Sequence, residues 1–207
     1  MLANKPYVIG LTGGIGCGKS EAARFLENLG AAHLDADAVS RALTAENGEA
    51  LADIRRVFGD AAFHEDGSLD RGKLGKLVFS NEPARRALEA IMHPLVQRNM
   101  LIAMDEAARQ GAGVVILDVP LLFETGMDAL CDETWALYVP RERQVDRIVA
   151  RDGLSPEDAV ARIDSQMPVE ERNARATYTV NTDRPLERTQ AELEQLYRAA
   201  LKRAEKA

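Results

Sequence analysis

The 207-residue sequence has little cysteine, few aromatic residues and no long apolar run. Its two cysteines, Cys17 and Cys131, form no CxxC pair, so neither a disulfide framework nor a thiolate metal site is expected. The histidines, His33, His64 and His93, are far apart and do not predict a zinc site. No window approaches the roughly 18 apolar residues of a membrane-spanning helix.

Basic residues are also in deficit, because 26 Lys and Arg stand against 33 Asp and Glu, for a net charge of −7. A chain this acidic is a poor candidate for general nucleic-acid binding. The first residues show no signal-peptide pattern, and with the scarce cysteine this predicts a cytoplasmic protein without a membrane partner. The length suits one globular domain with small insertions.

Short apolar runs alternate with helical patterns along the chain. Strands are expected at 7–12, 31–35, 114–118, 135–139 and 178–181. Helical spacing is found at 20–29, 49–58, 74–79, 83–110, 141–152 and around 186–201, and Ser155 starts another helix as its N-cap. This alternation predicts an α/β protein with a parallel sheet. Pro94 is expected to kink or divide the helix at 83–110 near His93.

A glycine-rich loop follows the first predicted strand. Gly13 to Ser20 fits the phosphate-binding pattern GxxxxGK[ST]. Glycines let backbone N–H groups turn toward phosphate oxygens, and the next helix presents its positive end to the same anion. Lys19 is placed to reach the β- and γ-phosphates, and the Ser20 hydroxyl to ligate Mg²⁺. We therefore expect a nucleoside triphosphate to be bound at Gly14, Ile15, Gly16, Cys17, Gly18, Lys19, Ser20 and Glu21.

The loop has two alternative interpretations, a dinucleotide-binding site and a reactive thiol at Cys17. A dinucleotide fingerprint, GxGxxG, would need glycine at Lys19 or Glu21 and is excluded. Cys17 either contributes its backbone N–H to the loop or is a reactive thiol at a helix N-terminus.

Acidic residues follow two of the predicted strands. Asp35 and Asp37 come after the second, where each fits either helix N-capping or a carboxylate near the acceptor hydroxyl of a kinase. Asp118 ends the run 114–117 and is expected to hold Mg²⁺, directly or through water. Glu124 is a weaker candidate, for which a structural role is equally plausible.

Arginines recur every four residues on one predicted helix. Arg143, Arg147 and Arg151 therefore share one face. That face is either solvated, with nearby carboxylates as partners, or neutralises the γ-phosphate during transfer.

These motifs occur in a particular order, namely the loop 11–20, Asp35-Ala36-Asp37, His93-Pro94, 118–124 (Asp-Val-Pro-Leu-Leu-Phe-Glu), and Gln144 with Arg147 and Arg151. In this order the sequence resembles the dephospho-coenzyme A kinase family over nearly its whole length. The resemblance implies a P-loop fold similar to nucleoside monophosphate kinases, with a parallel-sheet core flanked by helices, a helical substrate-binding insertion and a small lid. It divides a single domain, 1–207, into a core at about 1–48, 111–140 and 176–207, an insertion at about 49–110 and a lid at about 141–175.

The implied reaction transfers the γ-phosphoryl group of ATP to the ribose 3′-hydroxyl of dephospho-coenzyme A (EC 2.7.1.24). By resemblance, Asp37 is the base for that hydroxyl, and Lys19, Arg147 and Arg151 act on the phosphates, with Gln144 orienting the arginines. The resemblance further implies an acceptor pocket at Asp37, His93, Pro120 and Leu121, Mg²⁺ ligands at Ser20 and Asp118, and Asn181 near the adenine. His93-Pro94 also fits a simple helix kink. ATP and dephospho-coenzyme A are the expected partners of a monomer or small homo-oligomer.

Two positions depart from the family pattern. Glu21 stands where the family usually has threonine, and a carboxylate there would repel phosphate unless it turns outward. Thr177 stands where the family usually has aspartate. One alternative function is a GTP-dependent switch, but its Asn-Lys-x-Asp signature is missing. Another is a kinase with a different acceptor, such as a nucleoside monophosphate.

Overall fold

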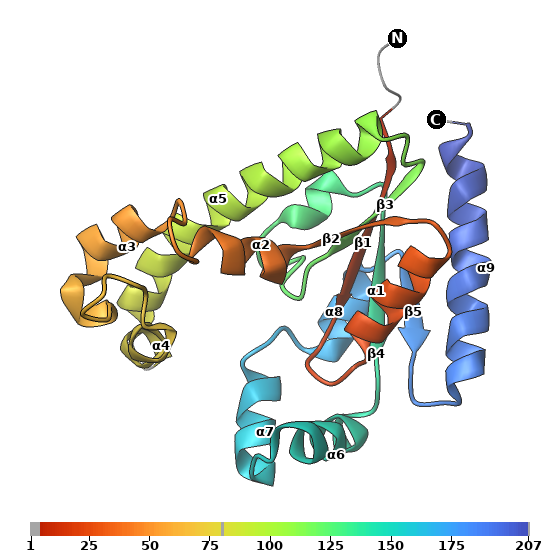
Figure 1. The fold of residues 1–207 in the computed structure, drawn as a ribbon. Helices are drawn as coiled ribbons and strands as arrows, with labels where there is room; N and C mark the ends of the chain where they lie inside the picture. Colours follow the sequence, from red (N-terminus) through yellow and green to blue (C-terminus); the bar gives the residue numbers. More distant parts are fainter. Residues whose placement is uncertain (1–4, 80, 207) are drawn as a thin grey trace. The chain divides into compact units, whose positions relative to one another are not determined.

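The computed structural model describes residues 5–79 and 81–206. The chain divides into two compact units, one formed by Met1–Leu34 with Met104–Ala207 and the other by Asp35–Ala103. Each unit has a buried apolar cluster of its own. Figure 1 follows the chain through both.

The first unit is built on a sheet that has five strands in the described residues, in the order β2-β3-β1-β4-β5. The strands are β1 (Tyr7–Gly13), β2 (Ala32–Asp35), β3 (Val114–Asp118), β4 (Glu133–Tyr138) and β5 (Tyr178–Asn181). β1 pairs in parallel with β3 and with β4, and β4 pairs in parallel with β5. The predicted α/β fold with a parallel sheet is confirmed.

The central position of β1 follows from its composition. A strand with neighbours on both edges and helices on both faces has no exposed side, so it needs a continuous apolar run. Val8, Ile9 and Leu11 are fully buried. Leu11 stands opposite Asp118 in the pairing with β3, so the loop after β1 begins beside the end of β3.

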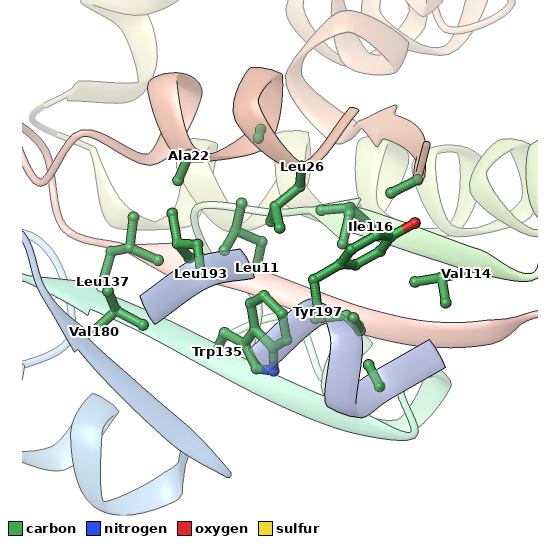
Figure 2. Packing of buried hydrophobic residues seen from close by; sticks show 14 of the residues in the cluster. Leu11, Ala22, Leu26, Val114, Ile116, Trp135, Leu137, Val180, Leu193 and Tyr197 are labelled. Atoms are coloured by element: carbon green, nitrogen blue, oxygen red, sulfur yellow. The ribbon is translucent and has the colours of Figure 1, made fainter. Parts of the chain in front are cut away.

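Helices cover this sheet. The helices of the first unit are α1 (Lys19–Asn28), η2 (Met127–Leu130, a 3-10 turn), α6 (Arg141–Asp152), α7 (Pro156–Asp164), α8 (Val169–Arg175) and α9 (Leu186–Ala204). Figure 2 shows Leu26 of α1 and Leu193 of α9 packed with Leu11 and Trp135 of the sheet. All four side chains are 1% exposed or less, so this layer fixes α1, and with it the loop before α1, on the sheet.

The second unit is helical. It contains α2 (Ala36–Leu43), α3 (Leu51–Phe58), η1 (Asp60–Ala62, a 3-10 turn), α4 (Arg71–Phe79) and most of α5 (Glu82–Arg109), which ends in the first unit. Ile54 and Ala62 are fully buried in its cluster. Helix α2 was not predicted from the sequence.

Pro94 lies inside α5, which continues unbroken from Glu82 to Arg109. Of the two predicted effects of Pro94, division of this helix is wrong and a kink stays a prediction. Proline in a helix interior removes one hydrogen bond and costs about 3 kcal/mol. Leu88 and Ile91 before Pro94, and Leu95 and Val96 after it, pack on the same apolar cluster, which holds both halves of α5 in place.

No helix in residues 5–79 and 81–206 combines the length and apolarity of a membrane span.

Candidate phosphate-binding site

The loop between β1 and α1 depends on glycine for two different reasons. Gly16 and Gly18 both have φ of 80°, a left-handed conformation that strains any residue with a Cβ. At Gly14 the constraint is space, because a Cβ there would lie 2.6 Å from Gln144 Nε2 and 3.2 Å from Arg172 Nη1. The pattern GxxxxGKS therefore reflects both backbone shape and close packing.

Gly18 is the N-cap of α1. The backbone N–H groups of Glu21 and Ala22 donate to Gly18 O at 3.1 Å, so the helix begins directly after the loop. The first N–H groups of a helix have no partner within it, and together with the helix dipole they attract an anion. The predicted phosphate loop is thus followed by the helix end that it requires.

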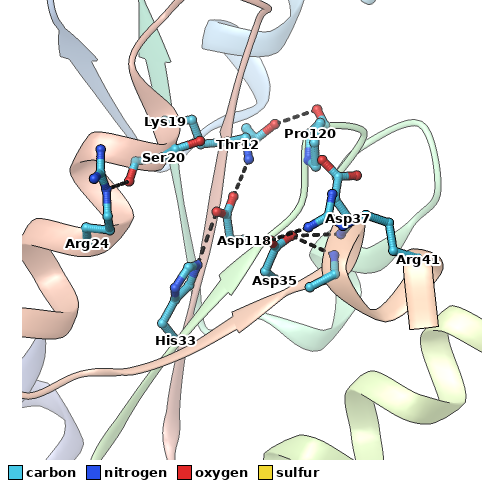
Figure 3. A network of polar contacts seen from close by, with 11 residues as sticks. Thr12, Lys19, Ser20, Arg24, His33, Asp35, Asp37, Arg41, Asp118 and Pro120 are labelled. Carbon is cyan, nitrogen blue, oxygen red and sulfur yellow. Dashed lines mark hydrogen bonds and ion pairs between the residues drawn. The ribbon is translucent and has the colours of Figure 1, made fainter. Parts of the chain in front are cut away.

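Lys19 donates to the buried carboxylate of Asp118. Its Nζ lies 2.5 Å from Asp118 Oδ1, and the ring nitrogen Nε2 of His33 lies 3.2 Å from Asp118 Oδ2 (Figure 3). Burial raises the pKa of Asp118, but the hydrogen bond from His33 and the charge and hydrogen bond of Lys19 outweigh it, so the pKa is lowered overall. Asp118 therefore stays a carboxylate although it is only 3% exposed.

The donor set at this place suits magnesium. Asp118 offers carboxylate oxygens, and Ser20, exposed at the start of α1, offers a hydroxyl. The described residues contain no group of three or more His, Cys, Asp or Glu side chains arranged for a metal. Mg²⁺ needs fewer, because it binds through one or two protein oxygens, phosphates and waters. Ser20 and Asp118 therefore fit it.

Two glutamines from the predicted lid hold the tip of the loop. Gln144 Nε2 on α6 donates to Ile15 O at 2.7 Å, and the Ile15 N–H donates to Gln166 Oε1, between α7 and α8, at 2.8 Å. Both backbone groups of Ile15 are thus bound by side chains more than 120 residues away along the chain. Gln166 was not predicted.

The arginines of α6 divide into two kinds. Arg147 donates to Gly16 O at 3.2 Å and to Thr182 O at 2.8 Å, so it lies against the phosphate loop. Arg143 pairs with Asp183 at 3.0 Å, and Arg151 with Asp152 at 2.7 Å, on the exposed side. Of these three arginines, Arg147 is the one whose hydrogen bonds reach the loop, and the role of the face in phosphate neutralisation stays a prediction.

Cys17 is a packed core residue. Its side chain is 2% exposed, and burial raises the pKa of its thiol. The Cys17 N–H donates to Gly14 O at 3.1 Å, within the loop. Burial and the raised pKa both argue against the alternative of a reactive thiol.

A cavity of about 210 Å³ lies next to the loop. Its lining includes Gly18, Glu21, Arg147 and Thr182, and also Thr189 and Leu193 of α9. Among the described residues, Asn181 does not line this cavity, and its Oδ1 instead accepts the N–H of Asp183 at 2.8 Å. Glu21 is exposed and borders the cavity.

The acids after β2 have separate roles. Asp35 caps α2 by accepting the N–H groups of Asp37 at 2.8 Å and Ala38 at 3.2 Å, so N-capping applies to Asp35. Asp37 lies exposed in the first turn of α2. His93 is exposed on α5. Asp37 and His93 belong to the second unit.

The segment after β3 belongs to the first unit. Pro120 O accepts the hydroxyl of Thr12 at 3.0 Å, which ties this segment to β1 just before the loop. The neighbouring Leu121 is 40% exposed. Glu124 Oε1 accepts the N–H of Met167 at 3.3 Å, which is the structural role left open for it.

Thr177 forms a closed pair with Thr134 of β4. The N–H of each residue donates to the hydroxyl of the other at 3.0 Å. Threonine thus joins the start of β4 to the residue before β5, which gives the unusual residue at this position a structural purpose.

The loop, the central parallel strand that leads into it, and the adjacent lysine and carboxylate together define a P-loop kinase. The fold also resembles solved structures. A protein from Thermus thermophilus superposes with a TM-score of 0.78 at 41% identity, covering 92% of this chain and 96% of that one. The structure titled dephospho-CoA kinase from Campylobacter jejuni gives a TM-score of 0.64 at 25% identity, covering 95% of this chain and 98% of that one.

Sequence comparison identifies the family. The model described as dephospho-CoA kinase matches residues 7–187. A dephospho-CoA kinase of Symbiobacterium thermophilum is 44% identical over 193 residues, which cover 93% of this chain and 81% of the relative. The chain belongs to the dephospho-CoA kinase family. The predicted activity, dephospho-CoA kinase (EC 2.7.1.24), is confirmed at this level, and the alternatives of a GTP switch or another acceptor are not supported.

Proposed function

We propose that this chain passes the γ-phosphoryl group of ATP to the ribose 3′-hydroxyl of dephospho-coenzyme A at the loop between β1 and α1. The observation that carries the proposal is the contact at 2.5 Å between Lys19, the first residue of α1, and Asp118, at the end of β3. This contact places a lysine ammonium and a buried carboxylate beside an anion-binding loop, the groups that phosphoryl transfer uses.

Lys19 has two partners in this scheme. In the structure its ammonium pairs with Asp118. With ATP bound, the same ammonium reaches the β- and γ-phosphates, and His33 still contacts the other oxygen of Asp118. The carboxylate thereby keeps its orientation while Lys19 changes partner.

Ser20 and Asp118 would hold Mg²⁺, which supplies neutralisation of phosphate charge when bound. Arg147, already against Gly16, and Arg151 add positive charge from α6 as charge builds up during transfer. Asp37 accepts the proton of the 3′-hydroxyl, the hydroxyl oxygen bonds to the γ-phosphorus, and the bond to ADP breaks.

The cavity beside Gly18 is the proposed place of the adenosine part of ATP. It adjoins the phosphate loop, and apolar Leu193 with polar Thr189 offers contacts for a base. The adenine is thus proposed to contact side chains that come after Asn181 in the sequence, in place of Asn181 itself. Glu21 borders the cavity and is proposed to face solvent when ATP is bound.

Asp37, His93, Pro120 and Leu121 remain the proposed acceptor-binding residues. The helical insertion at 49–110 and the lid at 141–175 remain proposals for substrate binding and closure. A cytoplasmic location and a monomer or small homo-oligomer stay predictions.

Asp37→Asn tests the proposed base. It keeps the shape but removes the proton acceptor, so transfer to dephospho-coenzyme A should fall by about 100-fold or more, while the Kd for ATP stays within about twofold. A coupled assay for ADP with and without dephospho-coenzyme A, together with calorimetry for ATP, measures both. Asp53→Asn, an exposed partner of Arg56 on α3, is the matched control and should behave as wild type.

Two results would contradict this scheme. Near-normal transfer by Asp37→Asn would remove Asp37 as the base. Equal ATP turnover by wild type with and without dephospho-coenzyme A would remove the acceptor.

A further inference from the structure

Arg172 is a buried arginine beside the phosphate loop. It lies on α8 and is 3% exposed. Its Nη2 donates to Met167 O at 2.7 Å, but its Nε has no hydrogen-bond partner among the described residues. Among the residues that the structure describes, no carboxylate comes within 4.0 Å of the Arg172 guanidinium.

Such an arrangement is costly for a protein. A guanidinium is always charged, so burial cannot neutralise it by loss of a proton. Buried charges are ordinarily paired, and an unpaired one loses its hydration without gaining a counter-charge. The cost indicates that the counter-charge of Arg172 is supplied by something other than the folded chain.

The surroundings of Arg172 indicate where that counter-charge binds. Its Nη1 would lie 3.2 Å from a Cβ at Gly14, so the guanidinium is next to the first half of the loop. It lines a cavity of about 190 Å³ together with Gln144 and Gln166, the two glutamines that hold Ile15. Burial raises the pKa of Cys17, and the positive charges of Arg172 and Arg147 act in the opposite direction, so the field of Arg172 reaches the loop.

We propose that Arg172 is a phosphate-recognition residue, whose uncompensated positive charge is balanced by the polyphosphate of ATP when the nucleotide occupies the loop. The loop already provides backbone N–H groups for the same anion, and Arg172 adds a full charge in a site shielded from water, where it is screened little by salt. This inference rests on the proposed binding of ATP at the loop. It adds a third arginine to the two on α6.

A structural role is the alternative. Arg172 would then serve to tie α8 to the end of the α7–α8 segment through Met167 O. The two roles predict opposite effects in the absence of ATP. Removing a structural tie lowers the melting temperature, whereas removing an unpaired buried charge leaves it unchanged or raises it.

Arg172→Met separates the two roles, because methionine fills much of the same volume without charge. We expect the melting temperature without nucleotide to be equal to or above that of wild type. The Kd for ATP, measured by calorimetry, should rise by about tenfold, the effect expected of one lost charge-assisted hydrogen bond. The Kd for AMP should change less, because fewer phosphates face the arginine.

Arg172→Lys retains the charge and should keep the Kd for ATP within about threefold of wild type. Arg198→Met is the matched control, because it removes the same charge from an exposed arginine of α9 paired with Glu194. It should leave the Kd unchanged. If the methionine variant does not fold, the lysine variant decides, since a loss of ATP affinity beyond tenfold with the charge still present would overturn the proposal.

An unchanged Kd for ATP in Arg172→Met would also overturn it, as would a lower melting temperature without any change in Kd. After such a result, the variant Lys19→Met shows whether only the inference about Arg172 is wrong or whether the proposed binding of ATP at the loop is wrong as well. If wild type binds ATP and Lys19→Met does not, the loop binds the triphosphate and the inference about Arg172 alone is wrong. If wild type does not bind ATP, the proposed function fails first.

Discussion

Single residues at this site are defined by what surrounds them. Asp118 is buried, yet it remains a carboxylate because Lys19 and His33 each contact one of its oxygens. Gly14 has no room for a side chain because Gln144 and Arg172 press against it. In both cases the chemistry of one residue is set by partners that lie elsewhere in the sequence.

The two cysteines give a direct test at this scale. Burial raises the pKa of Cys17, and burial, followed by the charges of Asp128 and Asp132, raises the pKa of Cys131 to about 12. A raised thiol pKa means that less thiolate is present at a given pH, so both thiols should be unreactive at pH 8. We expect alkylation by iodoacetamide to be about 100-fold slower, or more, in the folded protein than in urea.

Mass spectrometry of the labelled peptides measures each cysteine separately, and the urea-unfolded chain is the control. Rapid labelling of Cys17 in the folded protein would show a reactive thiol at the loop and would contradict its place in the core.

The sequence pattern predicted which residues form the loop. The pattern 13–20 placed Lys19 and Ser20 correctly at the junction of β1 and α1. Gln166, His33, Thr182 and Arg172 were not predicted, because each meets the loop or Asp118 only through folding. Nothing in their local sequence distinguishes them from ordinary polar residues.

At the scale of elements, α1 transmits the packing of the core to the loop. Its buried residues, Ala22, Ala23 and Leu26, face the sheet, and its first turn begins directly at the loop. The position of the loop therefore depends on how well α1 packs.

Leu26→Ala tests this dependence. Leu26 is fully buried between α1 and the sheet, so the truncation should lower the free energy of unfolding by about 2–5 kcal/mol. Urea denaturation followed by circular dichroism measures the change. Asn28→Ala, an exposed position on the same helix, should change it by less than about 0.5 kcal/mol. A loss below 1 kcal/mol for Leu26→Ala would show that α1 is not held by this contact.

Elements with strong local patterns were predicted well. The bounds of β3, α6 and β5 agree with the expected ranges. The sequence did not reveal that α5 passes through Pro94, because the local cost of proline is visible in the sequence and the packing of Leu88 and Leu95 on a distant cluster is not. Helix α2 and helix α8, which have eight and seven residues, were not predicted.

At the scale of the whole molecule, the chain forms two compact units connected through the end of β2 and through α5. The phosphate loop, the proposed magnesium ligands Ser20 and Asp118, and Arg172 lie in the first unit. The proposed base, Asp37, and His93 lie in the second.

Hydrogen exchange measured by mass spectrometry tests this division. ATP with Mg²⁺ should increase protection in peptides covering 13–20 and 141–175, because the loop and its partners there bind the phosphates. Dephospho-coenzyme A should increase protection in peptides from 49–110, the predicted insertion. The control for non-specific contact is the protein incubated with pantetheine in a buffer that contains no coenzyme A. If dephospho-coenzyme A left 49–110 unchanged, the insertion would not be the acceptor-binding part.

The sequence by itself determined the class of the protein and the order of its motifs, since glycine spacing, strand periodicity and the Lys-Ser pair are local properties. It also indicated the family, because those motifs follow one another in a specific order. Only the tertiary structure decided which polar side chains gather at the loop. Gln144, Gln166 and Arg172 approach Gly14 and Ile15 from more than 120 residues away, and that contact depends on how α6 and α8 pack on the sheet. Contacts between distant segments depend on the packing of the complete core, which no local pattern contains.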